Sequence, residues 1–176
     1  MKRPISITVL GTIGVLWGGF VLLIGVPFWI AFAIDPLGLM ERIAAWGNST
    51  LPHGVREALQ IPVMRFAALA SGLVDLAISG VLLIGAWKLL ALQEQGRRLM
   101  LGFALAFLFW KGMNFLLDRA VYEPVRQQYN IVQKERDRLA IPIDFVYAVA
   151  VLYFLTRPAI RDAMHDSRPA NSVLSH

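Results

Sequence analysis

The chain has 176 residues and no cysteine, and its composition is 57% hydrophobic and only 16% charged. Its mean hydropathy of +0.58 exceeds that of ordinary soluble domains and indicates a membrane protein. Without cysteine there can be no disulfide, thiolate nucleophile or Cys-ligated metal. No stretch between the apolar segments is long enough to form a soluble core, which excludes a separate catalytic domain.

Four apolar segments have the length of a membrane span, because about 20 helical residues cross the roughly 30 Å hydrocarbon layer. The first, Ile5–Ile34, is about twice as long as the apolar part of a secretory signal, so we expect it to remain as a span. We predict an all-α fold, an integral membrane four-helix bundle in one domain (1–176), with spans at about 5–34, 66–92, 99–117 and 139–156 and a cytoplasmic tail at 158–176.

Short interfacial helices are predicted in the first connection between spans. Asp35-Pro36 is an N-cap followed by a helix-initiating proline, and apolar residues then repeat at helical spacing until Gly47. Trp46 is the expected interfacial anchor of this helix, which would lie along the outer leaflet. Residues 52–60 are expected to form a second short helix.

The third connection and the C-terminal tail also contain predicted helices. Glu123-Pro124 resembles the start at Asp35-Pro36 and predicts a solvated helix over residues 125–139. The tail from Pro158 is expected to form a short helix followed by disorder.

An even number of spans places both termini on one side of the membrane. Lys and Arg are equally divided in number between the two sides, but the N-tail, the Lys88–Arg98 connection and the C-tail are shorter and carry the larger net positive charge. Because positively charged segments remain in the cytoplasm, we expect both termini there.

Three ionisable residues, Asp75, Lys111 and Asp144, lie inside the predicted spans. Each lies roughly 20 Å from the inner end of its span, so three helices carry a charge at one depth. Placing an ionisable side chain inside a span costs a few kcal/mol of insertion free energy, so such a side chain needs a partner or a water-filled cavity. We therefore expect two carboxyl groups and one ammonium group to meet in a single intramembrane cluster.

Asn114 and Tyr147, each one turn from a charged residue, complete the predicted cluster. One Lys cannot neutralise two carboxylates, so either one Asp is protonated or Asn114, Tyr147 or a water supplies the remaining hydrogen bonds. The favoured interpretation is an ion cluster that fixes helix packing. The alternatives are a proton- or ion-coupled transport site, a polar ligand pocket, and a contact with a partner helix.

A stripe of glycines, Gly11, Gly14, Gly18 and Gly25, follows one face of the first span. Small residues at this spacing allow close approach of a second helix in lipid. We expect helix packing within this chain, with a helix from another subunit as the alternative.

Aromatic residues are spread around their helices, so many must face lipid or another protein. On the third span we expect a lipid-facing or, alternatively, protein-docking surface that includes Phe103, Phe107, Phe109 and Trp110.

Several absences narrow the function. His53, His165 and His176 lie outside the spans, which excludes haem ligation by His within the membrane. No metalloprotease, P-loop or dinucleotide motif is present, so we expect no enzymatic activity, metal or cofactor. The basic residues alternate with acids and flank the spans, a pattern that favours anionic lipid over nucleic acid as the partner.

The opening segment RPISITVLG (residues 3–11), which runs into a glycine-rich first span, resembles the starts of small uncharacterised multi-span bacterial inner-membrane proteins. The resemblance covers about ten residues and implies location in the bacterial cytoplasmic membrane. It transfers no site residue to this chain.

These observations predict a non-enzymatic structural or accessory subunit of a homo-oligomer or of a larger membrane complex, with the lipid bilayer and other membrane subunits as partners. The alternative is a small-solute transporter that is coupled to protons or ions through the Asp-Lys-Asp cluster, which would require a watery route to each side of the membrane in turn.

Overall fold

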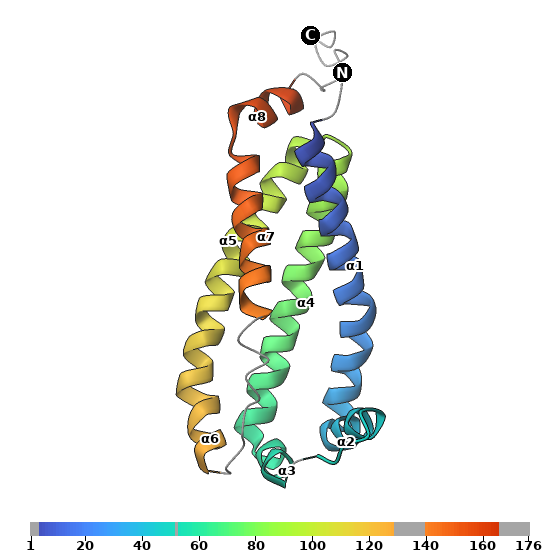
Figure 1. Cartoon of the computed structure of the whole chain (residues 1–176), viewed down its shortest axis with the longest axis vertical. Coiled ribbons are helices and arrows are strands. Elements are labelled where there is room, and N and C mark those ends of the chain that lie inside the picture. Colours follow the sequence, from blue (N-terminus) through green and yellow to red (C-terminus); the bar gives the residue numbers. More distant parts are fainter. Residues whose placement is uncertain (1–3, 52, 129–139, 166–176) are drawn as a thin grey trace, which may run out of the picture. The chain divides into compact units, whose positions relative to one another are not determined.

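The computed structural model describes residues 4–51, 53–128 and 140–165 (Figure 1). All regular secondary structure in these residues is helical, which confirms the predicted all-α class for the described part of the chain. The elements are α1 (Ile5–Ile34), α2 (Pro36–Trp46), α3 (His53–Gln60), α4 (Pro62–Leu90), α5 (Glu94–Leu117), the π-helix η1 (Asp118–Tyr122), α6 (Glu123–Gln128), α7 (Ala140–Leu155) and α8 (Pro158–His165).

Among the described residues, three helical segments are long and apolar enough to cross a membrane. They are α1, α4 and the continuous segment Glu94–Val125, which contains α5. The predicted fourth span corresponds to α7, which has 16 residues and a described apolar part of Phe145–Leu155. At 1.5 Å per residue α7 is about 24 Å long, shorter than the roughly 30 Å hydrocarbon layer.

The observed helix limits agree best with the predicted ones for α1, which is apolar from its first to its last residue. α1 has the predicted limits. α4 and α5 each begin four or five residues before the predicted span, at Pro62 and Glu94. A proline suits the first turn of a helix and a carboxylate is stabilised there, so both helices extend beyond their apolar segments.

The connection between α4 and α5 is only three residues long, shorter than the predicted Lys88–Arg98 connection. Leu92 adopts the left-handed conformation, with φ of 56°. The backbone N–H of Leu92 donates to Leu89 O, and that of Gln93 donates to Lys88 O. This is a Schellman end, which usually has glycine at the left-handed position, and here a leucine occupies it.

The predicted cap of α2 is confirmed. The Asp35 carboxylate accepts a hydrogen bond of 2.9 Å from the backbone N–H of Gly38, and Pro36 is the first helical residue. The helix ends through a second Schellman arrangement in which Asn48, with φ of 50°, follows the expected Gly47. α3 is the second predicted short helix.

α6 begins at Glu123, the predicted helix start, but it follows α5 and η1 without a loop. α5 continues through η1 into α6, and the Glu123 N–H donates to Asp118 O, five residues earlier. Pro124 has no N–H to donate, and the wider π turn lets the helix continue past it. The rest of this predicted helix (129–139) and the tail beyond residue 165 lie outside the described residues.

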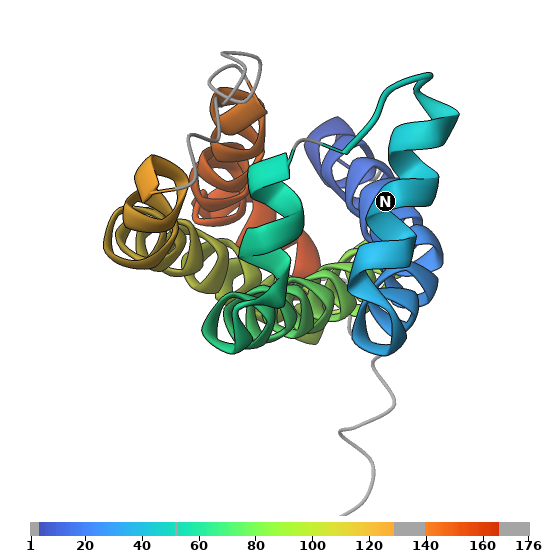
Figure 2. The same cartoon turned by 90° about the horizontal axis from the view of Figure 1, so that it is seen from below.

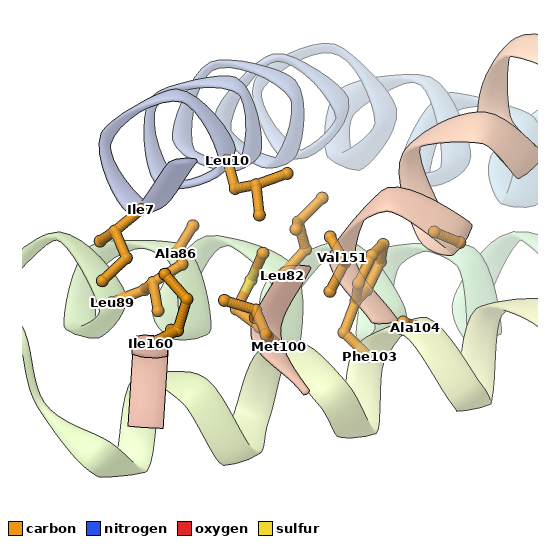
Figure 3. Close-up of a cluster of buried hydrophobic side chains, with 12 residues drawn as sticks. Ile7, Leu10, Leu82, Ala86, Leu89, Met100, Phe103, Ala104, Val151 and Ile160 are labelled. Atoms are coloured by element: carbon orange, nitrogen blue, oxygen red, sulfur yellow. The ribbon is translucent and has the colours of Figure 1, made fainter. Parts of the chain in front are cut away.

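The chain divides into two compact units. Unit 1 comprises Met1–Gly19, Ile78–Leu108 and Ile141–His176. Its core takes side chains from parts of α1, α4, α5 and α7 together with α8, and these side chains point toward one another (Figure 3). The core residues are Ile7, Leu10, Leu82, Ala86, Leu89, Met100, Phe103, Ala104, Ala148, Val151, Leu155 and Ile160.

Unit 2 comprises Phe20–Ala77 and Phe109–Ala140. Here α2 and α3 run crosswise to the long helices (Figure 2), and α3 contacts both α2 and α6. An ion pair between Arg56 and Glu41 links α3 to α2. The Trp29 ring lies directly over Gly72, so α1 and α4 are closely packed in this unit.

Candidate functional site

Asp75, the first residue of the predicted intramembrane cluster, is hydrogen-bonded to Trp110. The indole Nε1–H of Trp110 on α5 donates to Asp75 Oδ1 on α4 at 2.8 Å. Both residues belong to unit 2 and are partly buried. An indole N–H is a donor only, so the bond fits a carboxylate inside an apolar helix and links α4 to α5.

The bond gives Trp110 a role that the sequence analysis missed. Trp110 was expected to belong to a surface of aromatic residues, and its position next to Lys111 was the only signal of a polar partner. Phe103 of the same predicted surface is only 4% exposed and lies in the core of unit 1. Its ring centroid is 5.6 Å from that of Phe107 and 6.2 Å from that of Tyr147. Of the four aromatic residues, Phe109 is the one with a largely exposed side chain.

Lys111 and Asn114 lie on α5 and are both partly buried. Asp144 lies in the first turns of α7, and its side chain is outside the described residues. The described contacts therefore join Asp75 to Trp110, while the meeting of Asp75, Lys111 and Asp144 stays a prediction.

Tyr147 connects α7 to α1 within unit 1. Its hydroxyl donates a hydrogen bond of 3.0 Å to the backbone carbonyl of Leu10. Gly14 lies one turn further along α1, and a Cβ atom there would be 2.7 Å from the Tyr147 hydroxyl oxygen. The missing side chain thus makes room for the hydroxyl to reach Leu10. A hydroxyl has one hydrogen to donate, and in this structure Tyr147 gives it to α1.

The four glycines of the stripe on α1 lie against residues of α4. In unit 1, Cβ atoms added at Gly11 and Gly14 would collide with side chains of α4. At Gly18 the added Cβ would lie 3.1 Å from both Leu83 N and Ser79 O, which are backbone atoms. In unit 2, Gly25 lies against the side chain of Leu76. These glycines let two helices approach more closely than larger residues would.

Trp46, the predicted interfacial anchor, is the last residue of α2 and is 87% exposed. A tryptophan this exposed at the end of a short helix fits a position at the boundary between lipid and water, where its ring meets apolar groups and its N–H meets water.

A charged cluster at the start of α5 was not predicted. Arg97 donates two hydrogen bonds to the Glu94 carboxylate, at 2.6 and 2.9 Å, and a third to Leu155 O at 3.3 Å. Arg98 Nε donates to Glu94 at 3.3 Å. The spacing of Glu94, Arg97 and Arg98 was the available signal, because residues three and four apart are neighbours on a helix.

The described residues contain no group of three His, Asp or Glu side chains that could hold a metal ion. Comparison with models of known protein families, with characterised proteins and with solved structures finds no match to this chain.

Proposed function

We propose that this chain is an integral membrane protein with four spans, the fourth formed around α7, and that it acts as a non-enzymatic structural or accessory subunit. On this proposal both termini are cytoplasmic and the membrane is the bacterial inner membrane. Its partners are lipid and other membrane subunits, either copies of itself or parts of a larger complex.

The observation that carries the proposal is the distribution of residue size around the long helices. On α1 the glycines lie against α4, whereas Leu16, Trp17 and Phe20 are each more than half exposed. In water, so many large apolar side chains on the surface would cause aggregation. In a membrane they contact acyl chains or a neighbouring subunit, while the small residues hold the helices together.

The polar contacts inside the helices support a structural role over a transport role. Trp110 donates to Asp75 and so connects α5 to α4, and Tyr147 donates to Leu10 and so connects α7 to α1. Each bond joins two helices, which is the task of polar groups that stabilise helix packing in lipid. The transport alternative would place the Asp75 carboxylate on a path for protons or ions.

Purification of the tagged full chain from its native membrane in a mild detergent tests the proposal. We expect migration as a homo-oligomer or together with other membrane proteins, identified by mass spectrometry. A single monomeric species would contradict the proposed role as a subunit.

The variant Asp75→Asn separates the two functions. If the carboxylate is structural, the variant should be less thermally stable or assemble less completely. Proton flux is measured in proteoliposomes with an entrapped pH-sensitive dye, and Asp118→Asn, on the same helical segment as Lys111, is the matched control. Wild-type flux that is lost in Asp75→Asn while thermal stability and control flux are retained would favour the transporter.

A further inference from the structure

We propose that unit 1 carries a binding site for the headgroup of an anionic phospholipid, formed where the turn between α4 and α5 meets the junction of α7 and α8. We call this surface the headgroup site and define it by Lys88, Arg98, Arg157 and Arg161. The inference rests on the membrane location in the proposed function and names a lipid class that this surface would bind.

Contacts within unit 1 bring the two segments together. Arg97, next to Arg98, donates to the carbonyl of Leu155, two residues before Arg157. α8 is held at the same end, because Ile160 is buried in the core that also contains Leu89 (Figure 3). Figure 1 likewise shows α8 at the end of unit 1 where α4 turns into α5.

The cations of the headgroup site have donors available. The Arg98 side chain is 75% exposed, and its described hydrogen bond uses Nε alone. Arg157 is exposed and lies over the Tyr153 ring, with 4.4 Å between the guanidinium carbon and the ring centroid. One Nη hydrogen of Arg157 is donated to the Tyr153 hydroxyl, and a guanidinium group has four further N–H hydrogens. Lys88 Nζ donates to Gln95 at 2.8 Å and has two further hydrogens. A guanidinium group can bind a phosphate through two parallel hydrogen bonds, so Arg98 and Arg157 are the strongest candidates.

The charge balance matches an anionic partner. Around the turn and the junction there are five basic residues and two acidic ones, Glu94 and Asp162. Glu94 is already bonded to Arg97 and Arg98. The described residues of unit 2, by contrast, contain six basic and six acidic residues. Basic clusters next to membrane spans attract anionic lipids, so the excess in unit 1 favours such a lipid.

The apolar surface beside these cations indicates a lipid and not a free phosphate ion. Trp87 is 69% exposed immediately before Lys88, and Ile84, one turn earlier, is 55% exposed. On α7, Tyr153 and Val149, about one and two turns before Arg157, are also exposed. Exposed Trp and Tyr are typical of the headgroup level, and the aliphatic side chains beneath them fit acyl chains.

Native mass spectrometry of the full chain in detergent tests the site with phosphatidylglycerol as the anionic probe and phosphatidylcholine as the comparison. We expect wild type to retain phosphatidylglycerol preferentially. Arg98→Gln combined with Arg157→Gln should weaken that binding about thirtyfold, because each of the two basic residues contributes about 1 kcal/mol near an anionic headgroup and about 1.4 kcal/mol is tenfold in affinity. Arg42→Gln combined with Arg65→Gln removes the same charge from unit 2 and should leave binding unchanged.

Three outcomes would overturn the headgroup site. Wild type and the unit 1 variant could bind phosphatidylglycerol equally, or the unit 2 control could lose as much binding as the unit 1 variant. Alternatively, millimolar inorganic phosphate could displace the lipid from wild type. Circular dichroism checks the fold of each variant, and Arg98→Lys with Arg157→Lys should recover part of the affinity. Failure of wild type to retain phosphatidylglycerol, like equal binding by wild type and the Gln variant, overturns only the headgroup site. The proposed subunit role is tested separately, by the oligomeric state of the purified chain.

Discussion

Two adjacent glycines of α1 give a matched test of how unit 1 packs. A Cβ atom added at Gly18 would lie 3.1 Å from Leu83 N and Ser79 O and 3.2 Å from Leu83 Cβ. Two of these neighbours are backbone atoms of α4, which cannot rotate away as a flexible side chain can. At Gly19 an added Cβ would meet nothing within 4 Å. The variants Gly18→Ala and Gly19→Ala therefore differ in packing while making the same chemical change.

The expected magnitudes follow from two opposing effects. Alanine favours the helix over glycine by about 0.5–1 kcal/mol, and this gain applies at both positions. At Gly18, α4 must shift or the side chain must be strained, which costs about 1–3 kcal/mol for an overpacked contact. We expect Gly19→Ala to be neutral or stabilising, and Gly18→Ala to lower the free energy of unfolding by about 1–2 kcal/mol.

Equilibrium unfolding of the purified protein in mixed micelles, with increasing dodecyl sulfate and circular dichroism as the signal, measures this difference. If Gly18→Ala is as stable as Gly19→Ala, then Gly18 does not lie against α4 and the packing described for α1 is wrong.

Three further predictions concern polar contacts. Trp110→Phe removes the donor to Asp75 and should lower the free energy of unfolding by about 0.5–1.5 kcal/mol; in a double-mutant cycle with Asp75→Asn, additive effects would show that the two residues do not interact. Tyr147→Phe removes the hydrogen bond to α1 and should cost about 0.5–1 kcal/mol in the same unfolding assay, and an unchanged midpoint would contradict the contact. Glu94→Gln removes the carboxylate that accepts hydrogen bonds from Arg97 and Arg98 and should lower the free energy of unfolding by about 1–3 kcal/mol. An unchanged unfolding midpoint would refute the role of the ion pair.

Features that depend on local sequence were predictable here. The limits of α1 follow from its uninterrupted apolar residues, and the start of α2 follows from Asp35 and Pro36, because capping involves neighbours in the chain. The glycine stripe was also recognisable, since its residues repeat at helical spacing. Its partner, α4, was not, because any adjacent helix in the membrane could have served.

Features that depend on how helices are rotated against one another were not predictable. Trp110 bonds to Asp75 and Phe103 is buried, yet in the sequence both belong to the same set of aromatic residues. The short turn after α4 could not be predicted, because Leu92 occupies the left-handed position where a glycine usually marks the end of a helix. A pattern of residue types shows which residues share one face of a helix. Which residues they contact depends also on the rotation and crossing angle of the neighbouring helix, which the pattern does not give.

The hydrogen bond from Tyr147 to Leu10 joins residues 137 positions apart in the chain. The three-residue turn, in contrast, lets α4 and α5 pair as soon as both have been synthesised. During translation α1 can therefore dock against α4 through its glycines, but the tyrosine that fastens its first turns to α7 emerges from the ribosome much later. The contact between α7 and α1 in unit 1 is therefore available only after the hairpin of α4 and α5 has been synthesised.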